Sequence, residues 1–268
     1  MDWDDFEYEP DGERAEDSYT ISARDTLKAF FDHHRESVFF SNQLAVQNER
    51  EYFHWVTSRA IENLVGLGTV MTETRPLAGS SSIKLLWHRS HRYYKRDAKR
   101  LIALVEEYGS PNMRAAIGLH GESMVLEAFA RREFVMRGRH AREFRGKKWT
   151  NSQHNLDFIF ERDDQAYGVE VKNTLSYMDQ TELNTKLAMC DHLGIKPVFA
   201  VRMLPKNWIN DVVGAGGYAM IMRYQLYPWT HADLARRVAE ELELPVDAPR
   251  ALADGTMDRF LKWHTKNL

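Results

Sequence analysis

Residues 154–173 read HNLDFIFERDDQAYGVEVKN. The polar stretch Arg-Asp-Asp-Gln at 162–165 separates two alternating apolar runs, which predicts a β-hairpin with those four residues as its loop. The predicted register pairs Glu161 with Ala166 and continues with three pairs that share one face: Ile159 with Gly168, Asp157 with Glu170, and Asn155 with Lys172. The opposite face is apolar and belongs in a core: Leu156, Phe158, Phe160, Tyr167, Val169 and Val171. A slip of one residue would misplace Asp157, so the pattern favours this register.

Two carboxylates and one lysine therefore gather on the polar face. Asp157 and Glu170, placed opposite each other, repel unless a cation lies between them. Oxygen ligands of this kind suit Mg²⁺ or Mn²⁺. Lys172 lies on the same face, where an ammonium can orient or help deprotonate a water and offset phosphate charge. The simpler alternative is a solvent-facing charge pair on an ordinary strand.

Asp157, a short hairpin loop and then Glu170-Val171-Lys172 resemble the motif of the PD-(D/E)xK nuclease superfamily. The proline of that motif is absent, because Leu156 precedes Asp157. The resemblance implies a restriction-endonuclease-like fold in which Asp157 and Glu170 bind metal, together with the Val171 carbonyl. It also implies that Lys172 acts on the attacking water.

Many members of the superfamily carry a further glutamate early in a helix before the hairpin. A helix is expected over residues 119–136, and Glu122 falls in its first turn. The resemblance gives Glu122 a role in holding the metal, directly or through water. A negative side chain there also suits the helix dipole, which leaves a structural role equally open. Glu127 is the second choice.

The elements after the hairpin predict a mixed central sheet flanked by helices. The spacing of apolar residues predicts a helix over 179–193 that stops at Gly194, a strand over 196–203, a short helix over 205–213 and a strand over 218–223. Amphipathic helices are expected over 230–244 and 254–268. They are expected to pack onto the core, and a homodimer contact is the alternative.

Composition limits the class of protein. The chain has 268 residues, of which 43% are hydrophobic and 28% charged, as in soluble globular proteins. No stretch approaches the length of a membrane span, and the acidic start is unlike a secretory signal. The single cysteine, Cys190, excludes an internal disulfide and fits the reducing cytoplasm.

Charge is unevenly distributed along the chain. The net charge is −3, yet residues 1–20 hold nine acids and one base, so the remainder carries +5. We expect this acidic lead to be disordered. A tail that mimics DNA and covers a basic face is the sharper alternative.

The segment 21–110 is expected to form a separate domain. It shows a helix over 24–38 capped by Ser22, two more helices over 41–47 and 52–67, and two strands over 69–74 and 82–87. This pattern resembles a winged helix, which implies DNA binding through the third helix. The candidate contacts on it are His54, Thr57, Ser58 and Arg59, with Arg75 and Lys84 beside the wing. A protein-interaction module is the alternative.

Two basic runs extend the expected DNA surface. The first, within residues 89–100, begins a linker helix and includes Arg92, Lys95 and Arg96. The second lies just before the hairpin, and we expect it near the predicted site: Arg137, Arg139, Arg142, Arg145, Lys147 and Lys148. Contact with DNA phosphates is the functional interpretation, and a solvated surface is the alternative. Gly109-Ser-Pro111 marks the boundary before a nuclease-like domain over 111–268.

The sequence thus predicts a Mg²⁺-dependent DNA endonuclease, a phosphodiester hydrolase, with a winged-helix DNA-reading domain. A non-catalytic DNA-binding regulator on an inactive nuclease fold is the first alternative. A nuclease that acts on RNA, or only within a complex, is the second.

Overall fold

A computed structural model describes residues 17–78 and 81–268. The chain is mixed α/β and divides into two compact units. Unit 1 comprises the described residues up to Met113 together with Glu240–Leu244, and unit 2 comprises Arg114–Ala239 and Pro245–Leu268. In these described ranges, the helices are all too short or too polar to cross a bilayer.

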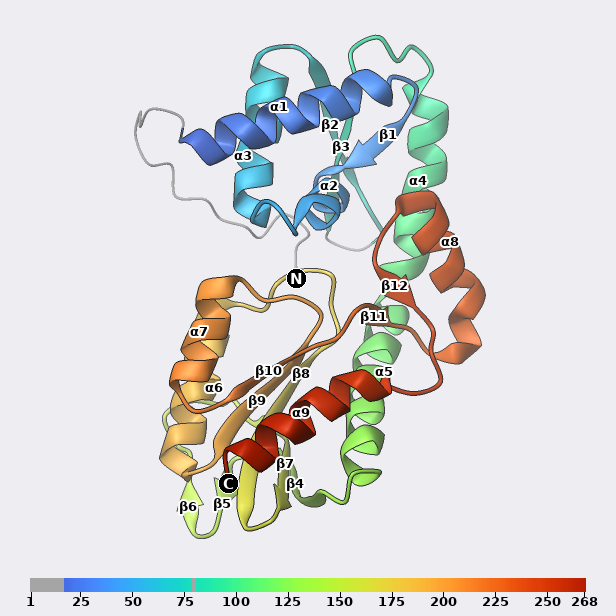
Figure 1. Ribbon diagram of the computed structural model, residues 1–268. Helices are drawn as coiled ribbons and strands as arrows, with labels where there is room; N and C mark the ends of the chain where they lie inside the picture. Colours follow the sequence, from blue (N-terminus) through green and yellow to red (C-terminus); the bar gives the residue numbers. More distant parts are fainter. Residues whose placement is uncertain (1–16, 79–80) are drawn as a thin grey trace. The chain divides into compact units, whose positions relative to one another are not determined.

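Unit 1 joins helices to a three-stranded antiparallel sheet with strand order β1-β3-β2 (Figure 1). Its elements are α1 (Ser18–His33), β1 (Val38–Phe40), α2 (Ser41–Asn48), α3 (His54–Gly66), β2 (Val70–Pro76), β3 (Ser82–His88) and α4 (Tyr94–Tyr108). Leu27, Leu44 and Leu64, one from each of the first three helices, pack with Leu86 in one buried cluster. The predicted second and third helices, the two strands of the hairpin and the linker helix are confirmed.

The start and end of α1 differ from the prediction. Asp17, and not Ser22, is the N-cap, because its carboxylate accepts a hydrogen bond from the backbone N–H of Thr20 at 2.8 Å. The helix ends at His33, a turn follows at residues 35–36, and the strand β1 begins at Val38, where the predicted helix was to end. Of the acidic lead predicted to be disordered, residues 1–16 lie outside the described residues. Residues 17–20 form the cap and first turn of α1.

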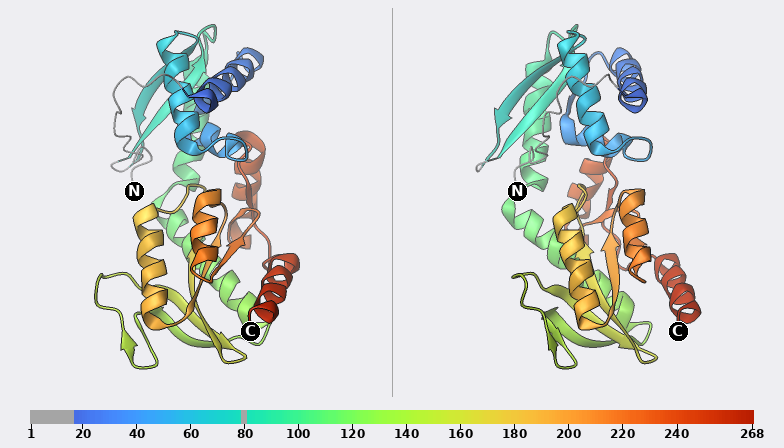
Figure 2. Two further views of the ribbon diagram at one scale, coloured as in Figure 1. Left: turned by 60° about the vertical axis from the view of Figure 1, so that its left-hand side comes forward. Right: turned by 90° about the vertical axis from the view of Figure 1, so that its left-hand side faces the viewer.

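Unit 2 is built on a five-stranded mixed sheet with strand order β10-β9-β8-β7-β4 (Figures 1 and 2). The sheet strands are β4 (Val135–Ala141), β7 (Leu156–Arg162), β8 (Gln165–Lys172), β9 (Lys196–Val201) and β10 (Tyr218–Ile221). The helices are α5 (Pro111–Ala130), α6 (Gln180–Leu193), α7 (Lys206–Gly214), α8 (Ala232–Leu242) and α9 (Asp254–Lys266), with a 3₁₀ turn η1 (Trp229–His231). The short strands are β5 (Glu143–Phe144), β6 (Lys147–Lys148), β11 (Gln225–Leu226) and β12 (Val246–Asp247). Strands β8, β9 and β10 run parallel, whereas β4, β7 and β8 are antiparallel.

Both faces of the hairpin β7–β8 are buried. On one face, Phe158 and Phe160 pack with Phe129 of α5 and Phe260 of α9. On the other face, Ile159 packs with residues of α6. Burial on both sides explains the nearly continuous apolar character of β8 and β9. The prediction that a C-terminal helix packs onto the core is confirmed for α9.

The predicted hairpin register is confirmed in its central part. Glu161 pairs with Ala166 and Ile159 with Gly168. The turn is tighter than predicted, because Arg162 also pairs with Gln165 and leaves two loop residues, Asp163 and Asp164. Both have positive φ, 51° and 59°, as a two-residue I′ hairpin turn requires, and aspartate tolerates that conformation.

Two predictions in this unit are wrong. The helix expected over 119–136 runs from Pro111 to Ala130 instead, and it is followed by a turn at residues 131–133 and by β4 from Val135. Leu156 was expected beside Phe158, but its Cδ1 atom lies 2.8 Å from where a Cβ on Gly168 would be, on the α6 face. Gly168 leaves space there, and the Leu156 side chain fills it.

Candidate functional site

The Asp157 carboxylate lies where β7 and β8 stop pairing. The antiparallel ladder ends at the pair of Phe158 and Val169, so the predicted pairs of Asp157 with Glu170 and of Asn155 with Lys172 are not part of it. Instead, Oδ2 of Asp157 accepts a hydrogen bond from the backbone N–H of Val171 at 2.7 Å. This bond holds the carboxylate beside the Glu170-Val171-Lys172 segment. The side chain of Val171 is in the core, so only its backbone carbonyl is available as a ligand.

Glu170 is buried between two lysines. Its Oε2 lies 2.5 Å from Nζ of Lys186, and its Oε1 lies 3.5 Å from Nζ of Lys172. Burial raises the pKa of Glu170 to about 7, and the negative charge of Asp157 adds to the shift. The two ammonium groups act in the opposite direction without cancelling it. A cation bound nearby would therefore favour the ionised form of this carboxyl group.

Lys172 is paired with a residue of α6. Its Nζ lies 2.7 Å from Oε1 of Glu182. Burial alone would lower the pKa of Lys172, but the hydrogen bond to Glu182 and the charge of Glu170 outweigh it, so the pKa is raised. The lysine is thus held as a cation beside Glu170.

Helix α6 supplies two charged residues that the sequence reasoning missed, Glu182 and Lys186. They alternate with Glu170 and Lys172 in one ion chain, in the order Lys186, Glu170, Lys172, Glu182. Glu182 and Lys186 are four residues apart on a helix, or about 6.0 Å along its axis. Glu170 and Lys172 are two residues apart on a strand, or about 6.6 Å, so the spacing of the helix pair matches that of the strand pair. The Glu-x-x-x-Lys spacing after the hairpin was the available signal.

Asp157 is half-buried, and its pKa is raised. Burial is the main cause, and the negative charge of Glu122 contributes, whereas the Val171 N–H and Lys186 oppose the shift. Glu122 therefore lies within electrostatic reach of Asp157. Its carboxylate pairs with Arg139 at 3.3 Å.

The helix-dipole interpretation of Glu122 is wrong, because Glu122 lies in the middle of α5 and not in its first turn. Glu127, the second choice, is about half exposed and pairs with Arg131 on the same helix at 2.6 Å. Nothing in these contacts connects Glu127 to the site.

Asn173, directly after Lys172, fixes the end of β8. Its Nδ2 donates to the carbonyls of Ile117 and Leu226, at 2.9 and 2.7 Å, and its Oδ1 accepts from the Leu226 N–H at 2.7 Å. Gly121 of α5 makes this approach possible, because a Cβ there would lie 2.6 Å from the Cβ of Asn173. The position of Lys172 thus depends on α5 and β11.

The second basic run lies only in part where it was predicted: Arg139 pairs with Glu122 near Asp157, whereas Arg145, Lys147 and Lys148 lie elsewhere. Arg145 pairs with Glu161 at the turn end of the hairpin, four residues or about 13 Å along β7 from Asp157. Lys148 accepts a hydrogen bond through its carbonyl from His192 in the last turn of α6, and Lys147 lies beside Gly194. Because α6 has 14 residues, its two ends are about 20 Å apart. Arg145, Lys147 and Lys148 therefore lie at the end of the sheet away from Glu182, whereas Arg142 donates to the carbonyl of Ser152.

In unit 1, the first basic run is exposed at the start of α4: Arg92, Lys95 and Arg96. On α3, the predicted contacts His54 and Thr57 are wrong, because both side chains are buried in the unit. Ser58 donates to the carbonyl of His54, and Arg59 is about one-third exposed and lies 3.5 Å from Asp17. The helix turns these two residues away from its buried face.

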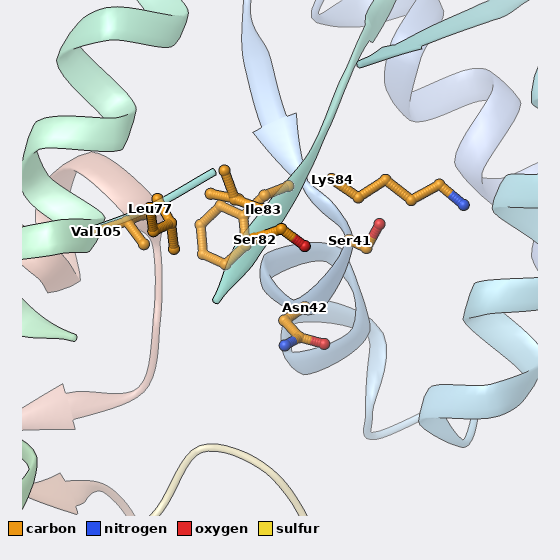
Figure 3. Close-up of a pocket in the computed structure, with 8 residues that line it drawn as sticks. Ser41, Asn42, Leu77, Ser82, Ile83, Lys84 and Val105 are labelled. Atoms are coloured by element: carbon orange, nitrogen blue, oxygen red, sulfur yellow. The ribbon is translucent and has the colours of Figure 1, made fainter. Parts of the chain in front are cut away.

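A small cavity in unit 1 is lined by Ser41, Leu77, Ile83 and Val105 among others (Figure 3). Its volume of about 10 Å³ holds no more than about one water. Lys84, predicted beside the wing, points away from Leu77 and Val105 (Figure 3). Arg75 is paired with Glu73 at 2.9 Å. The cavity is too small for a substrate.

The oxygen donors at the site fit a hard divalent cation. Among the residues that the structure describes, Oδ1 of Asp157 has no hydrogen-bond partner, and Glu170 lies close enough for the two charges to repel. No group of three or more His, Cys, Asp or Glu residues in residues 17–78 and 81–268 is arranged to hold a metal. Mg²⁺ usually takes only one or two protein carboxylates, with water and phosphate completing its shell. Asp157 and Glu170 meet that need, provided that Glu170 exchanges the Lys186 ammonium for the ion.

No family model matches the chain, and no curated protein matches it. A crystal structure of protein VC1899 from Vibrio cholerae is similar at 12% identity and a TM-score of 0.26. The similarity covers 85% of this chain and 52% of that one, so the chain spans about half the length of VC1899. A TM-score this low does not show a shared fold.

Proposed function

We propose that the protein is a Mg²⁺-dependent DNA endonuclease of the PD-(D/E)xK type. The observation that carries the proposal is the hydrogen bond of Asp157 to the Val171 N–H, which places one carboxylate beside Glu170 and Lys172. The order of α5, β4, β7, β8, α6 and β9, with β8 and β9 parallel, supports a restriction-endonuclease-like core. Mn²⁺ is the alternative ion.

The residues divide the chemical work. Asp157 and Glu170 would hold the cation with the Val171 carbonyl, and Glu122 would support it directly or through water. When bound, the ion would polarise the phosphodiester and lower the pKa of a coordinated water. Lys172 would orient that water and offset charge on the phosphate. Asn173 would hold Lys172 in place through its bonds to α5 and β11.

Unit 1 supports a role in DNA binding. Helices α1–α3 and the β2–β3 hairpin, with β1 pairing to β3, support the interpretation of this unit as a winged helix. The exposed bases at the start of α4 and Arg59 on α3 are the proposed phosphate contacts. We propose that this unit binds DNA and that unit 2 cleaves it.

Cleavage of supercoiled, linear and branched DNA with Mg²⁺ or Mn²⁺ tests the proposal, and an RNA substrate tests the alternative target. Asp157→Asn should reduce the rate at least about a hundredfold, because a metal ligand is lost. Asp164→Asn is the matched control: it makes the same change at the hairpin turn, where asparagine also tolerates positive φ. If Asp157→Asn cleaves as fast as the control, the site is wrong.

A DNA-binding regulator without catalytic activity is the second candidate. It is favoured by the close pairing of Glu170 with Lys186, which occupies one of the proposed metal ligands. DNA binding without cleavage at any Mg²⁺ or Mn²⁺ concentration would support it.

A further inference from the structure

Lys186 is an unusual residue for a helix of a mixed α/β unit, because its ammonium is almost completely buried. Only 4% of its side chain is exposed. Its two acceptors are Oε2 of Glu170 and the backbone carbonyl of Asn155. Burying an ammonium is costly unless it is paired and hydrogen-bonded, so the position calls for an explanation beyond packing.

The charges around Glu170 provide that explanation. Asp157 adds negative charge near Glu170, and Glu122 adds it near Asp157, while Lys172 is shared with Glu182. The Nζ atom of Lys186 lies 2.5 Å from the Glu170 carboxylate, closer than that of Lys172 at 3.5 Å. It supplies positive charge to a place where two carboxylates would otherwise repel each other.

We propose that Lys186 is an internal counter-ion that occupies Glu170 in the metal-free protein and weakens its binding of divalent cations. The inference rests on the proposed function, since it concerns the same metal ligands. A cation that binds Glu170 must compete with the ammonium. The Asn155 carbonyl gives the ammonium a second acceptor, so Lys186 remains hydrogen-bonded when Glu170 changes its partner. Lys186 is thus a positioning residue that acts through Glu170.

Titration of the full-length protein with Mn²⁺ by calorimetry, without nucleic acid, tests the proposal. Lys186→Met should bind Mn²⁺ at least about tenfold more tightly than the wild type, because the positive charge that repels the cation next to a ligand is removed. Lys196→Met is the matched control. It removes the same charge in the same unit, from a partly exposed lysine that donates to the Asn267 carbonyl, and should leave Mn²⁺ affinity unchanged.

A purely structural lysine would give a different result. Lys186→Met would then lower the melting temperature without a gain in Mn²⁺ affinity. The proposal expects a lower melting temperature without metal and a larger rise on adding Mn²⁺ than in the wild type. Lys186→Gln provides a second variant if methionine prevents folding, because an amide can still donate to the Asn155 carbonyl. Unchanged or weaker Mn²⁺ affinity in the folded variant, or no Mn²⁺ binding in either protein, overturns the proposal.

Plasmid cleavage by the same wild-type sample separates this proposal from the proposed function. If the wild type cleaves DNA with Mg²⁺ while the variant shows no gain in affinity, only the role of Lys186 is wrong. If affinity rises but no nucleic acid is cleaved, the role of Lys186 stands and the nuclease assignment fails.

Discussion

Lys172 and Glu182 form an ion pair between strand β8 and helix α6, with Nζ and Oε1 2.7 Å apart. The lysine that the motif singles out is thus held by a residue from the next helix along the chain. Its partner is about one-fifth exposed, so water can reach the pair. Substituting Lys172 and Glu182 separately can therefore distinguish a direct role of the lysine from an indirect role of the glutamate.

For the proposed nuclease, Lys172→Met should reduce metal-dependent cleavage by about a hundredfold or more, because a positive charge next to the reacting phosphate is lost. Glu182→Gln should reduce it by no more than about tenfold, since the lysine keeps its charge and its contact with Glu170. Single-turnover cleavage rates measure both effects. A larger loss for Glu182→Gln than for Lys172→Met would contradict the prediction, because it would mean that Glu182, and not Lys172, acts directly on the reaction.

Glu170 should make the stability of the metal-free protein depend on pH. Its pKa is about 7 in the folded state against 4.5 for the free side chain. Between these pH values the folded state binds more protons than the unfolded state. The contribution of protonated Glu170 to stability is therefore fully present below pH 4.5 and is lost as the pH rises through about 7. The free energy of unfolding should therefore differ by about 3 kcal/mol between the two ends of this pH range.

Urea unfolding with EDTA at pH 5 and pH 8 checks this dependence. The contributions of other titrating groups to the unfolding free energy cancel when the wild type is compared with Glu170→Gln at each pH. The unfolding free energy of the wild type relative to the variant should be higher at pH 5 than at pH 8. An equal difference at the two pH values would mean that Glu170 is not shifted.

Two glycines of α5 should respond in opposite ways to the same substitution. Gly121→Ala would place a Cβ 2.6 Å from that of Asn173, whose hydrogen bonds prevent it from moving away, so we expect a loss of about 1–3 kcal/mol. Gly118→Ala meets nothing within 4 Å and should stabilise the helix by about 0.5–1 kcal/mol. Thermal and urea unfolding of both variants measure the difference. Similar effects at the two positions would contradict the close approach at Gly121.

The two basic runs should contribute differently to DNA binding and cleavage. Replacing Arg92, Lys95 and Arg96 by alanine should weaken binding and reduce the salt dependence by up to about 0.9 per lost phosphate contact. The matched triple change of Arg145, Lys147 and Lys148 should leave the cleavage rate close to that of the wild type, because these residues lie away from Asp157. Fluorescence anisotropy at several salt concentrations and cleavage rates measure the two effects. A slower cleavage step in the second variant would place DNA across that end of the sheet.

Several elements could be predicted because their signals are local. Alternation along 156–160 and 166–171 determines which side chains of the hairpin share a face, with the exception of Leu156. Asp179 and Gly194 mark the two ends of α6: the first caps its N-terminus, and the second adopts a φ of 71° after its last residue. Strand β4 was missed because it lies at the edge of the sheet and is largely exposed, so it lacks the apolar alternation that marks a strand.

By itself, the sequence determined the hairpin, the central part of its register and the grouping of Asp157, Glu170 and Lys172. Only the tertiary structure decided that α6 lies over this face and that Glu182 and Lys186 complete the ion chain. The physical reason is that strand alternation and helix caps depend on neighbouring residues, whereas the contact between a helix and a strand depends on the space between them. Gly168 allows the close approach of Cys190 on α6, and Gly121 allows that of α5 to Asn173. Their missing side chains become informative only when the facing residues are known.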